Sequence, residues 1–330
     1  MSLALNGRPG VAASTRERVL AAAEELGYRP NLIARRLFAQ ETGILGVLFH
    51  DLSGFFMAQI LRGINQEAAA RGYSVILSVS ERRLERERET LDLLVGEQVD
   101  GIILCTTAPL DGGQHLEQFK SRQIPMVLVD RYLDNVQTDY VVSDNEAGAY
   151  QLIEHLLDAG HQRIGVVAPN DPASSVRDRV RGCMRALSDR GASGDDRLVK
   201  RVSIFSDQGL IRNLDSLYGA LDELMQEETP PTAVVTMSSD LTPAALGWLK
   251  RRGIRMPEDV ALVGFDQVPL LSSLEIHLTT IAQSPFLMGI SATRLLLDRI
   301  AGKDGAEGQV KIPTALVEGP ERGSLGAIVA

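Results

Sequence analysis

The sequence has only two cysteines among its 330 residues, and Cys105 and Cys183 lie far apart. This spacing matches neither a disulfide framework nor a zinc site, so we expect two free thiols. Aromatic residues make up only 5% of the chain, which argues against a stacking platform for single-stranded nucleic acid. No apolar run approaches the roughly 18 residues of a membrane helix, and the N-terminus lacks the basic and apolar regions of a secretory signal. The sequence therefore predicts a cytoplasmic protein without a membrane partner.

Sequence motifs of common enzymes are missing as well. The chain contains no GxxxxGK[ST] phosphate loop and no GxSxG nucleophile elbow. Its histidines show no metal-binding spacing, and they are scattered over His50, His115, His155, His161 and His277. We therefore expect neither catalysis nor a metal or other cofactor.

Charge is distributed unevenly along the chain, whose formal net charge is −9. Residues 1–40 carry six arginines against three glutamates, a formal charge of +3, so the remainder carries −12. A basic N-terminal segment on an acidic body is expected when only one end of a protein meets phosphate.

Two helices are predicted in this basic segment. Residues 14–26 begin with a Ser/Thr capping candidate and continue with apolar residues at helical spacing. Residues 31–40 form a second, short helix after a turn that contains Pro30. A helix of this length is marginal in water by itself.

From Ile44 onward, short apolar runs rich in β-formers alternate with amphipathic helical patterns. The runs are ILGVLF, YSVILSVS, VDGIILCT, IPMVLVD, RIGVVAP, TAVVTM and VALVGFD, and the helical patterns include residues 57–70, 147–159 and 284–301. Such alternation predicts an α/β fold with parallel sheets covered on both faces. Seven or more units over about 280 residues indicate two doubly wound subdomains rather than one.

Three regions follow from this pattern. Residues 1–42 form the basic helical segment. The first subdomain is predicted to contain residues 43–160 plus 284–303, because the late helix could return to it, and the second to contain residues 161–283 plus 304–330. Ligands of open α/β sheets bind outside the carboxyl ends of the strands, so two facing edges predict a small-molecule cleft between the subdomains.

The sequence resembles the LacI/GalR family of bacterial transcriptional regulators. The resemblance begins with LNGRPGVAASTRERVLAAAEELGYRPNLIARRLFAQETGILGVLF and continues through VVSDNEAGAYQLIEHLLDAGHQRIGVV and MPEDVALVGFDQ to LTTIAQSP, in the family's order over roughly residues 4–320. It implies a periplasmic-binding-protein-like fold for the two subdomains. In the family a helix-turn-helix precedes the LNG sequence, and only Ala4 to Gly7 match its recognition helix here. We therefore expect a truncated headpiece, because either the expressed segment or the gene sequence starts too late. We also expect weak or absent operator binding by this chain.

The resemblance also gives residues 31–40 a role. In related repressors the paired hinge helices of a dimer fold against the DNA minor groove, where a leucine wedges between base steps. The matching residue is Leu37, and Asn31, Ala34 and Arg35 belong to the same hinge. The alternative is that Leu37 is an ordinary packing residue of the helix.

Four residues carry the main effector-site prediction. The resemblance places an aromatic against the ligand at Phe56, or also at Phe55, and the alternative is two core phenylalanines. It places a ligand-gripping arginine at Arg179, with Arg177 as the competitor if the register slips by two. Asp266, at a strand end, matches a hydroxyl-binding aspartate that can accept bonds from vicinal hydroxyls. Arg179 and Asp266 across one cleft predict a neutral sugar-like ligand.

Further lining candidates are less constrained by the sequence. Ser239 stands where the family usually has asparagine, beside Asp240. Asp144, Gln283 and Phe205 complete the set, although the loop around Phe205 aligns poorly. Each aspartate could instead cap a helix or form a turn.

The combined prediction is a homodimeric, effector-responsive repressor of operator DNA. The alternative is a periplasmic-type sugar receptor of a transport system, which shares the two-lobed fold. Such a receptor has no use for the arginine-bearing helix and hinge of residues 14–37. No leucine-heptad tail follows Gly319, so a tetramer through a C-terminal coiled coil is not expected.

Overall fold

The computed structural model describes residues 10–26, 42–192, 195–203, 214–303, 305–306 and 308–319. The chain divides into two compact units, Met1–Thr42 and Gly43–Ala330. The first unit contains α2 (Ala13–Glu25), close to the predicted helix, and none of the residues of α2 is buried. The predicted hinge residues lie outside the described residues. Within the described ranges, no helix combines the length and the apolar character of a membrane span.

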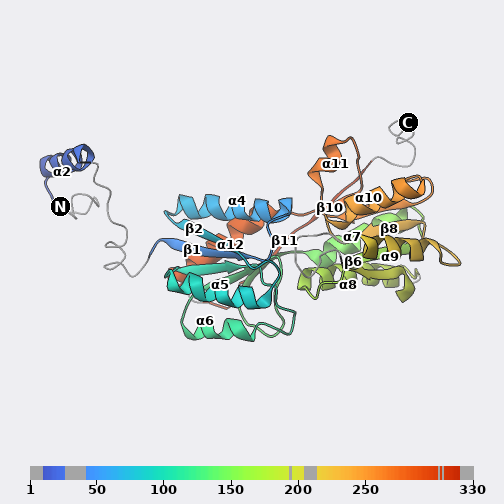
Figure 1. Ribbon diagram of the computed structural model, residues 1–330, viewed down its shortest axis with the longest axis horizontal. Helices are drawn as coiled ribbons and strands as arrows, with labels where there is room; N and C mark the ends of the chain where they lie inside the picture. Colours follow the sequence, from blue (N-terminus) through green and yellow to red (C-terminus); the bar gives the residue numbers. More distant parts are fainter. Residues whose placement is uncertain are drawn as a thin grey trace. The chain divides into compact units, whose positions relative to one another are not determined.

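The second unit contains two six-stranded sheets, each the centre of one lobe (Figure 1). In the first lobe the strand order is β11-β5-β4-β3-β1-β2, and all neighbours are parallel. The strands are β1 (Ile44–Phe49), β2 (Ser74–Val79), β3 (Gly101–Leu104), β4 (Met126–Val129), β5 (Asp139–Ser143) and β11 (Gln309–Ile312). The helices are α4 (Phe55–Ala70), α5 (Leu84–Gly96), η1 (Gln114–Leu116), α6 (Glu117–Ser121) and α12 (Pro285–Ile300). Helices α4 and α12 pack on one face of the sheet and α5 on the other, which buries both faces.

The second lobe repeats this arrangement with the strand order β12-β10-β9-β8-β6-β7. The strands are β6 (Ile164–Pro169), β7 (Val199–Val202), β8 (Ala233–Thr236), β9 (Ala261–Phe265), β10 (Thr280–Ala282) and β12 (Ala315–Val317). The helices are α7 (Asn145–Asp158), α8 (Ser174–Asp189), η2 (Asp196–Leu198), α9 (Asp215–Met225), α10 (Leu241–Arg252) and α11 (Pro269–Ser273). The predicted α/β architecture is confirmed, with the edge strand β12 as an antiparallel exception.

The boundaries between the lobes differ from the predicted ones at two places. Helix α7, assigned to the first subdomain by the sequence, packs against α8 in the second lobe, and its Leu152, Ile153 and Leu156 share one core with Val166. Strand β11, assigned to the second subdomain, pairs with β5 in the first sheet. An apolar stripe shows that a helix is covered, but it does not show which sheet covers it. Helix α12 does return to the first lobe, as the orange-red helix among its blue and teal elements shows (Figure 1).

Two glycines allow α4 and α12 to pack backbone against backbone. A Cβ atom on Gly63 would lie 2.1 Å from the carbonyl oxygen of Phe286, and one on Gly289 would lie 2.1 Å from that of Ile60. Such distances are far inside van der Waals contact, so no larger residue fits without moving a helix. The two glycines thereby set how closely the returning helix α12 packs in the first lobe.

Both cysteine thiols are free and fully buried. Burial raises the pKa of Cys183 to about 12, and burial together with Asp130 raises the pKa of Cys105 well above its usual value. Because the thiolate is the reactive form, we expect neither thiol to react with a disulfide reagent at pH 8 in the native protein. Denaturation in urea should expose two reactive thiols per chain. Rapid labelling of either cysteine before unfolding would contradict this prediction.

Candidate effector-binding site

A cavity lies between the two lobes, where strands of both sheets end. Residues from the first lobe line one side of it, namely His50, Asp51, Ser53, Gly54, Phe56, Met57, Arg82, Asp130 and Arg131. Residues from the second lobe line the other, namely Pro169, Asp171, Ser175, Val176, Arg179, Met237, Ser238, Ser239, Asp240, Asp266 and Gln283. Many of them follow directly after a strand, as expected for a ligand site of parallel sheets. Among the described residues, no cluster of His, Cys, Asp and Glu could hold a metal ion.

The cavity contains most of the residues predicted from the sequence. Phe56, Arg179, Ser239, Asp240, Asp266 and Gln283 all line it. Phe55 does not line it and is 59% exposed at the start of α4, because successive helical residues point about 100° apart and Phe56 takes the inward direction. Phe205 lies outside the described residues.

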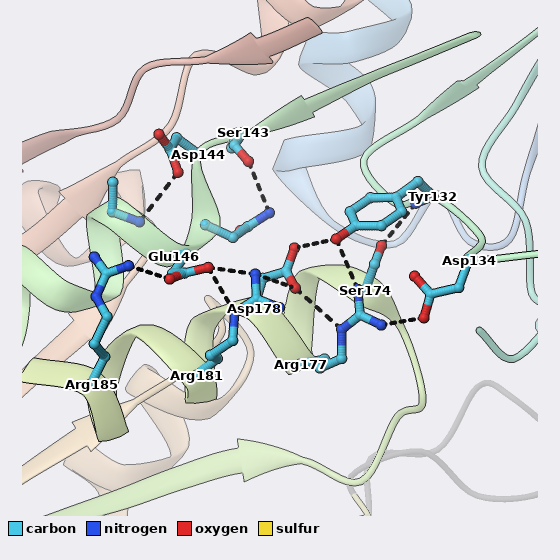
Figure 2. Close-up of polar contacts among 12 residues, drawn as sticks. Tyr132, Asp134, Ser143, Asp144, Glu146, Ser174, Arg177, Asp178, Arg181 and Arg185 are labelled. Carbon is cyan, nitrogen blue, oxygen red and sulfur yellow. Dashed lines mark hydrogen bonds and ion pairs between the residues drawn. The ribbon is translucent and has the colours of Figure 1, made fainter. Parts of the chain in front are cut away.

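The prediction for Asp144 as a lining residue is wrong. Its side chain accepts a hydrogen bond of 3.2 Å from the backbone N–H of Ala147 and so caps α7 (Figure 2). This is the capping role that the sequence left open. The cap stabilises the first turn of the helix that enters the second lobe after β5.

Arg179 is held rigidly in the wall of the cavity and is only 5% exposed. Its Nε donates to Oδ1 of Asn145 at 2.8 Å, and its Nη1 donates to the carbonyl oxygen of Met237 at 2.8 Å. The guanidinium also lies 3.9 Å from the centre of the Phe265 ring. These contacts fix the planar group before any ligand binds, which lowers the entropy lost on binding.

Asp266 follows β9 and is 8% exposed. It has a positive φ of 83°, which is unusual for a residue other than glycine and marks a constrained turn. Gln283 donates a hydrogen bond to its carboxylate. Oδ2 of Asp266 lies 3.7 Å from Nη1 of Arg179, which is beyond hydrogen-bond distance. Both groups therefore keep capacity for ligand hydroxyls. Arg179 and Asp266 both belong to the second lobe, so they stand side by side and not on opposite sides of the cleft as predicted.

The first lobe contributes the buried carboxylate of Asp130 to the cavity, a residue that the sequence did not single out. It follows β4, is 6% exposed and has a positive φ of 70°, so it matches Asp266 in position and conformation. Burial raises the pKa of its carboxyl group. The signal was present in the sequence, because IPMVLVD and VALVGFD are both apolar strands that end in aspartate.

A group of charges that the sequence did not predict spans the cleft. Asp171 follows β6 in the second lobe, and its Oδ2 lies 3.6 Å from Nη1 of Arg82 and 3.6 Å from Nη2 of Arg131, both in the first lobe. Asp51 lies 3.5 Å from Nε of Arg82. His50 lies beside them and bonds Sγ of Cys105 through Nδ1 at 3.0 Å. Burial, with Arg131 and Arg82 as further causes, lowers the pKa of His50 well below its usual value, so it is neutral at pH 7.

Arg177 does not line the cavity, which removes the competitor to Arg179. It lies in a separate polar network between the lobes, in which Tyr132 and Asp134 of the first lobe point toward α8 (Figure 2). Tyr132 donates its N–H to Oγ of Ser174 at 2.8 Å and its hydroxyl to Asp178 at 2.9 Å, and Arg177 pairs with Asp134. This network links the lobes independently of the cavity.

A two-lobed α/β domain with a cavity between its lobes, lined by charged and polar side chains, defines a class of small-molecule binding protein. The family model for a periplasmic binding protein-like domain matches residues 153–320. A second model, for bacterial regulatory proteins of the lacI family, matches residues 1–31.

Individual relatives agree with both models. Catabolite control protein A of Priestia megaterium is 32% identical over 298 residues, which cover 90% of this chain and 86% of that protein. The transcriptional repressor CytR of Escherichia coli K12 is 30% identical over 329 residues, 99% of this chain and 92% of that protein. The lac repressor bound to ONPG superposes with a TM-score of 0.82 at 27% identity, over 96% of this chain and 93% of that structure. The chain belongs to the LacI family of bacterial transcriptional regulators, which confirms the resemblance found in the sequence.

Proposed function

We propose that this protein is an effector-responsive transcriptional repressor that binds a sugar-like molecule between its lobes. The observation that carries the proposal is the pair of buried groups Arg179 and Asp266, which share one cavity and keep unused hydrogen-bonding capacity. A fixed guanidinium beside a carboxylate can bind the hydroxyls and ring oxygen of a polyol. The protein acts by binding and not by catalysis.

The relatives support this proposal over a transport receptor. CytR is a transcriptional repressor, and solved relatives were obtained as a complex with cellobiose and with bound ribose. A lac repressor structure shows a dimer on its operator. We propose the same assembly here, a homodimer whose hinge residues Asn31, Ala34, Arg35 and Leu37 contact operator DNA. Closure of the lobes would then alter operator affinity through a coupling energy on the order of 1–3 kcal/mol.

A ligand screen by thermal unfolding tests the proposed site. We expect at least one monosaccharide, disaccharide or nucleoside to raise the melting temperature, since a ligand at 100 times its Kd adds about 2.7 kcal/mol of stability. The same compound should leave the melting temperature of Asp266→Asn unshifted, because the amide has no negative charge and offers one acceptor oxygen where the carboxylate offers two. Equal shifts in both proteins would place the ligand outside this cavity, and failure of all compounds would contradict the proposed ligand class.

A further inference from the structure

The effector cavity continues into a second cavity that the proposed sugar site does not use. The two cavities share His50, Arg82, Arg131, Pro169 and Asp171. The second has a volume of about 230 Å³, against about 120 Å³ for the first, so it has room for a substituent beyond one ring. Its other described lining residues include Thr107, Asn170 and Ser203.

The two cavities differ in charge. Five aspartates and three arginines line the first cavity among the described residues. The described lining of the second contains two arginines, Arg82 and Arg131, and one carboxylate, Asp171. His50 lines both and adds no charge at pH 7, because its pKa is well below the usual value. A ligand with a neutral end and an anionic end would therefore bind with its anion in the second cavity.

Arg131 has hydrogen-bonding capacity that the protein leaves unused. It is 8% exposed, and its buried Nε has no hydrogen-bond acceptor. Its ion pairs, with Oδ2 of Asp130 at 3.7 Å and with Oδ2 of Asp171 at 3.6 Å, are both longer than a hydrogen bond. A buried guanidinium donor without an acceptor is costly unless something supplies one, and a ligand that supplies an anionic oxygen would recover that cost.

We propose that the effector is an anionic sugar derivative, with its hydroxylated ring beside Arg179 and Asp266 and its phosphate or carboxylate between Arg82 and Arg131. This inference rests on the proposed function and replaces the neutral ligand expected from the sequence, which considered Arg179 and Asp266 alone. In this arrangement Asp171 occupies, from the opposite lobe, part of the position that the ligand anion takes. Binding then exchanges the carboxylate of Asp171 for that of the ligand or for its phosphate.

Calorimetry on matched ligand pairs tests the proposal. The probes are glucose against glucose 6-phosphate and gluconate, and ribose against ribose 5-phosphate, each at low and high ionic strength. We expect the anionic compound of at least one pair to bind with about tenfold or more higher affinity than its neutral parent. This difference in affinity should shrink as the ionic strength rises. Tightest binding by a phosphate identifies a sugar phosphate, and tightest binding by gluconate identifies a sugar acid. If neutral sugars bind and no anionic partner binds more tightly, this inference is overturned while the proposed function stands. If none of these compounds binds, this inference is overturned, and the wider thermal screen decides the proposed function.

Variants separate the anion contacts from the ring contacts. Arg82→Gln and Arg131→Gln should each lower the affinity for the anionic ligand by about tenfold. The affinity for its neutral parent should fall by less than about threefold. Asp171→Asn should raise the affinity for the anionic ligand by about threefold or more, because it removes a competing negative charge. Arg86→Gln is the matched control, since Arg86 pairs with Glu81 in the same lobe and lines neither cavity. The proposal would be overturned if the folded Arg82→Gln protein lost equal affinity for neutral and anionic ligands. It would also be overturned if Asp171→Asn bound the anionic ligand more weakly.

Discussion

Replacing Arg179 with alanine is expected to weaken effector binding by more than about tenfold. The side chain donates to Asn145 and Met237 and contacts the Phe265 ring, so its guanidinium is already oriented toward the cavity. Alanine removes both the charge and the planar set of donors, and Asp266 loses its nearest cation. Calorimetric titration of the ligand found by the thermal screen measures the effect.

Two further variants distinguish the reasons for that loss. Arg179→Lys keeps the positive charge but not the planar fork, so most of the affinity should still be lost. Arg185→Ala is the matched control on the same helix, because Arg185 is half-exposed and pairs with Glu146 on α7 (Figure 2). Unchanged affinity in both Arg179→Ala and Asp266→Ala would show that the effector binds elsewhere.

Replacing Gly63 with alanine is expected to produce a large loss of stability. The new Cβ would lie 2.1 Å from the carbonyl oxygen of Phe286, which belongs to the backbone and cannot rotate away. The helices α4 and α12 would have to separate, at a cost of about 3 kcal/mol or more, at or beyond the upper end for added core methylenes. Thermal unfolding followed by circular dichroism should show a clearly lower midpoint.

Gly219 provides the matched control for this substitution. It also lies inside a helix, α9, but an added Cβ would meet no atom within 4 Å. Gly219→Ala should therefore stabilise the protein by about 0.5–1 kcal/mol, because alanine favours the helix over the unfolded chain. If Gly63→Ala unfolds at or above the wild-type midpoint, the close packing of α4 on α12 is wrong.

Much of the lining of the candidate site could be predicted because strand ends are visible in the sequence. Asp266 and Ser239 follow short apolar runs that are typical of buried parallel strands, and the carboxyl ends of such strands share one edge. Arg179 came from the resemblance to the family, since nothing in its spacing separates it from Arg177. The structure places Arg179 in the cavity and Arg177 in the network with Tyr132 and Asp134.

The charged residues that meet across the cleft have partners that are distant in sequence. Asp171 meets Arg82 and Arg131 only because two lobes come together, across separations of 89 and 40 positions. No local pattern encodes such a meeting. Asp130 could have been found, since its strand ends as the strand before Asp266 does.

The alternation of short apolar runs with amphipathic helical patterns was sufficient to predict two doubly wound lobes. A strand covered on both faces leaves a continuous apolar run, and a helix covered on one face leaves a helical repeat. The family followed from motifs spread over nearly the whole length. Packing in three dimensions decided the other features. These are the lobe to which α7 and β11 belong, the choice of Phe56 over Phe55, the cap at Asp144 and the charge bridge at Asp171. These features arise from contacts between segments that are remote along the chain, and such contacts form only when the folded surfaces meet.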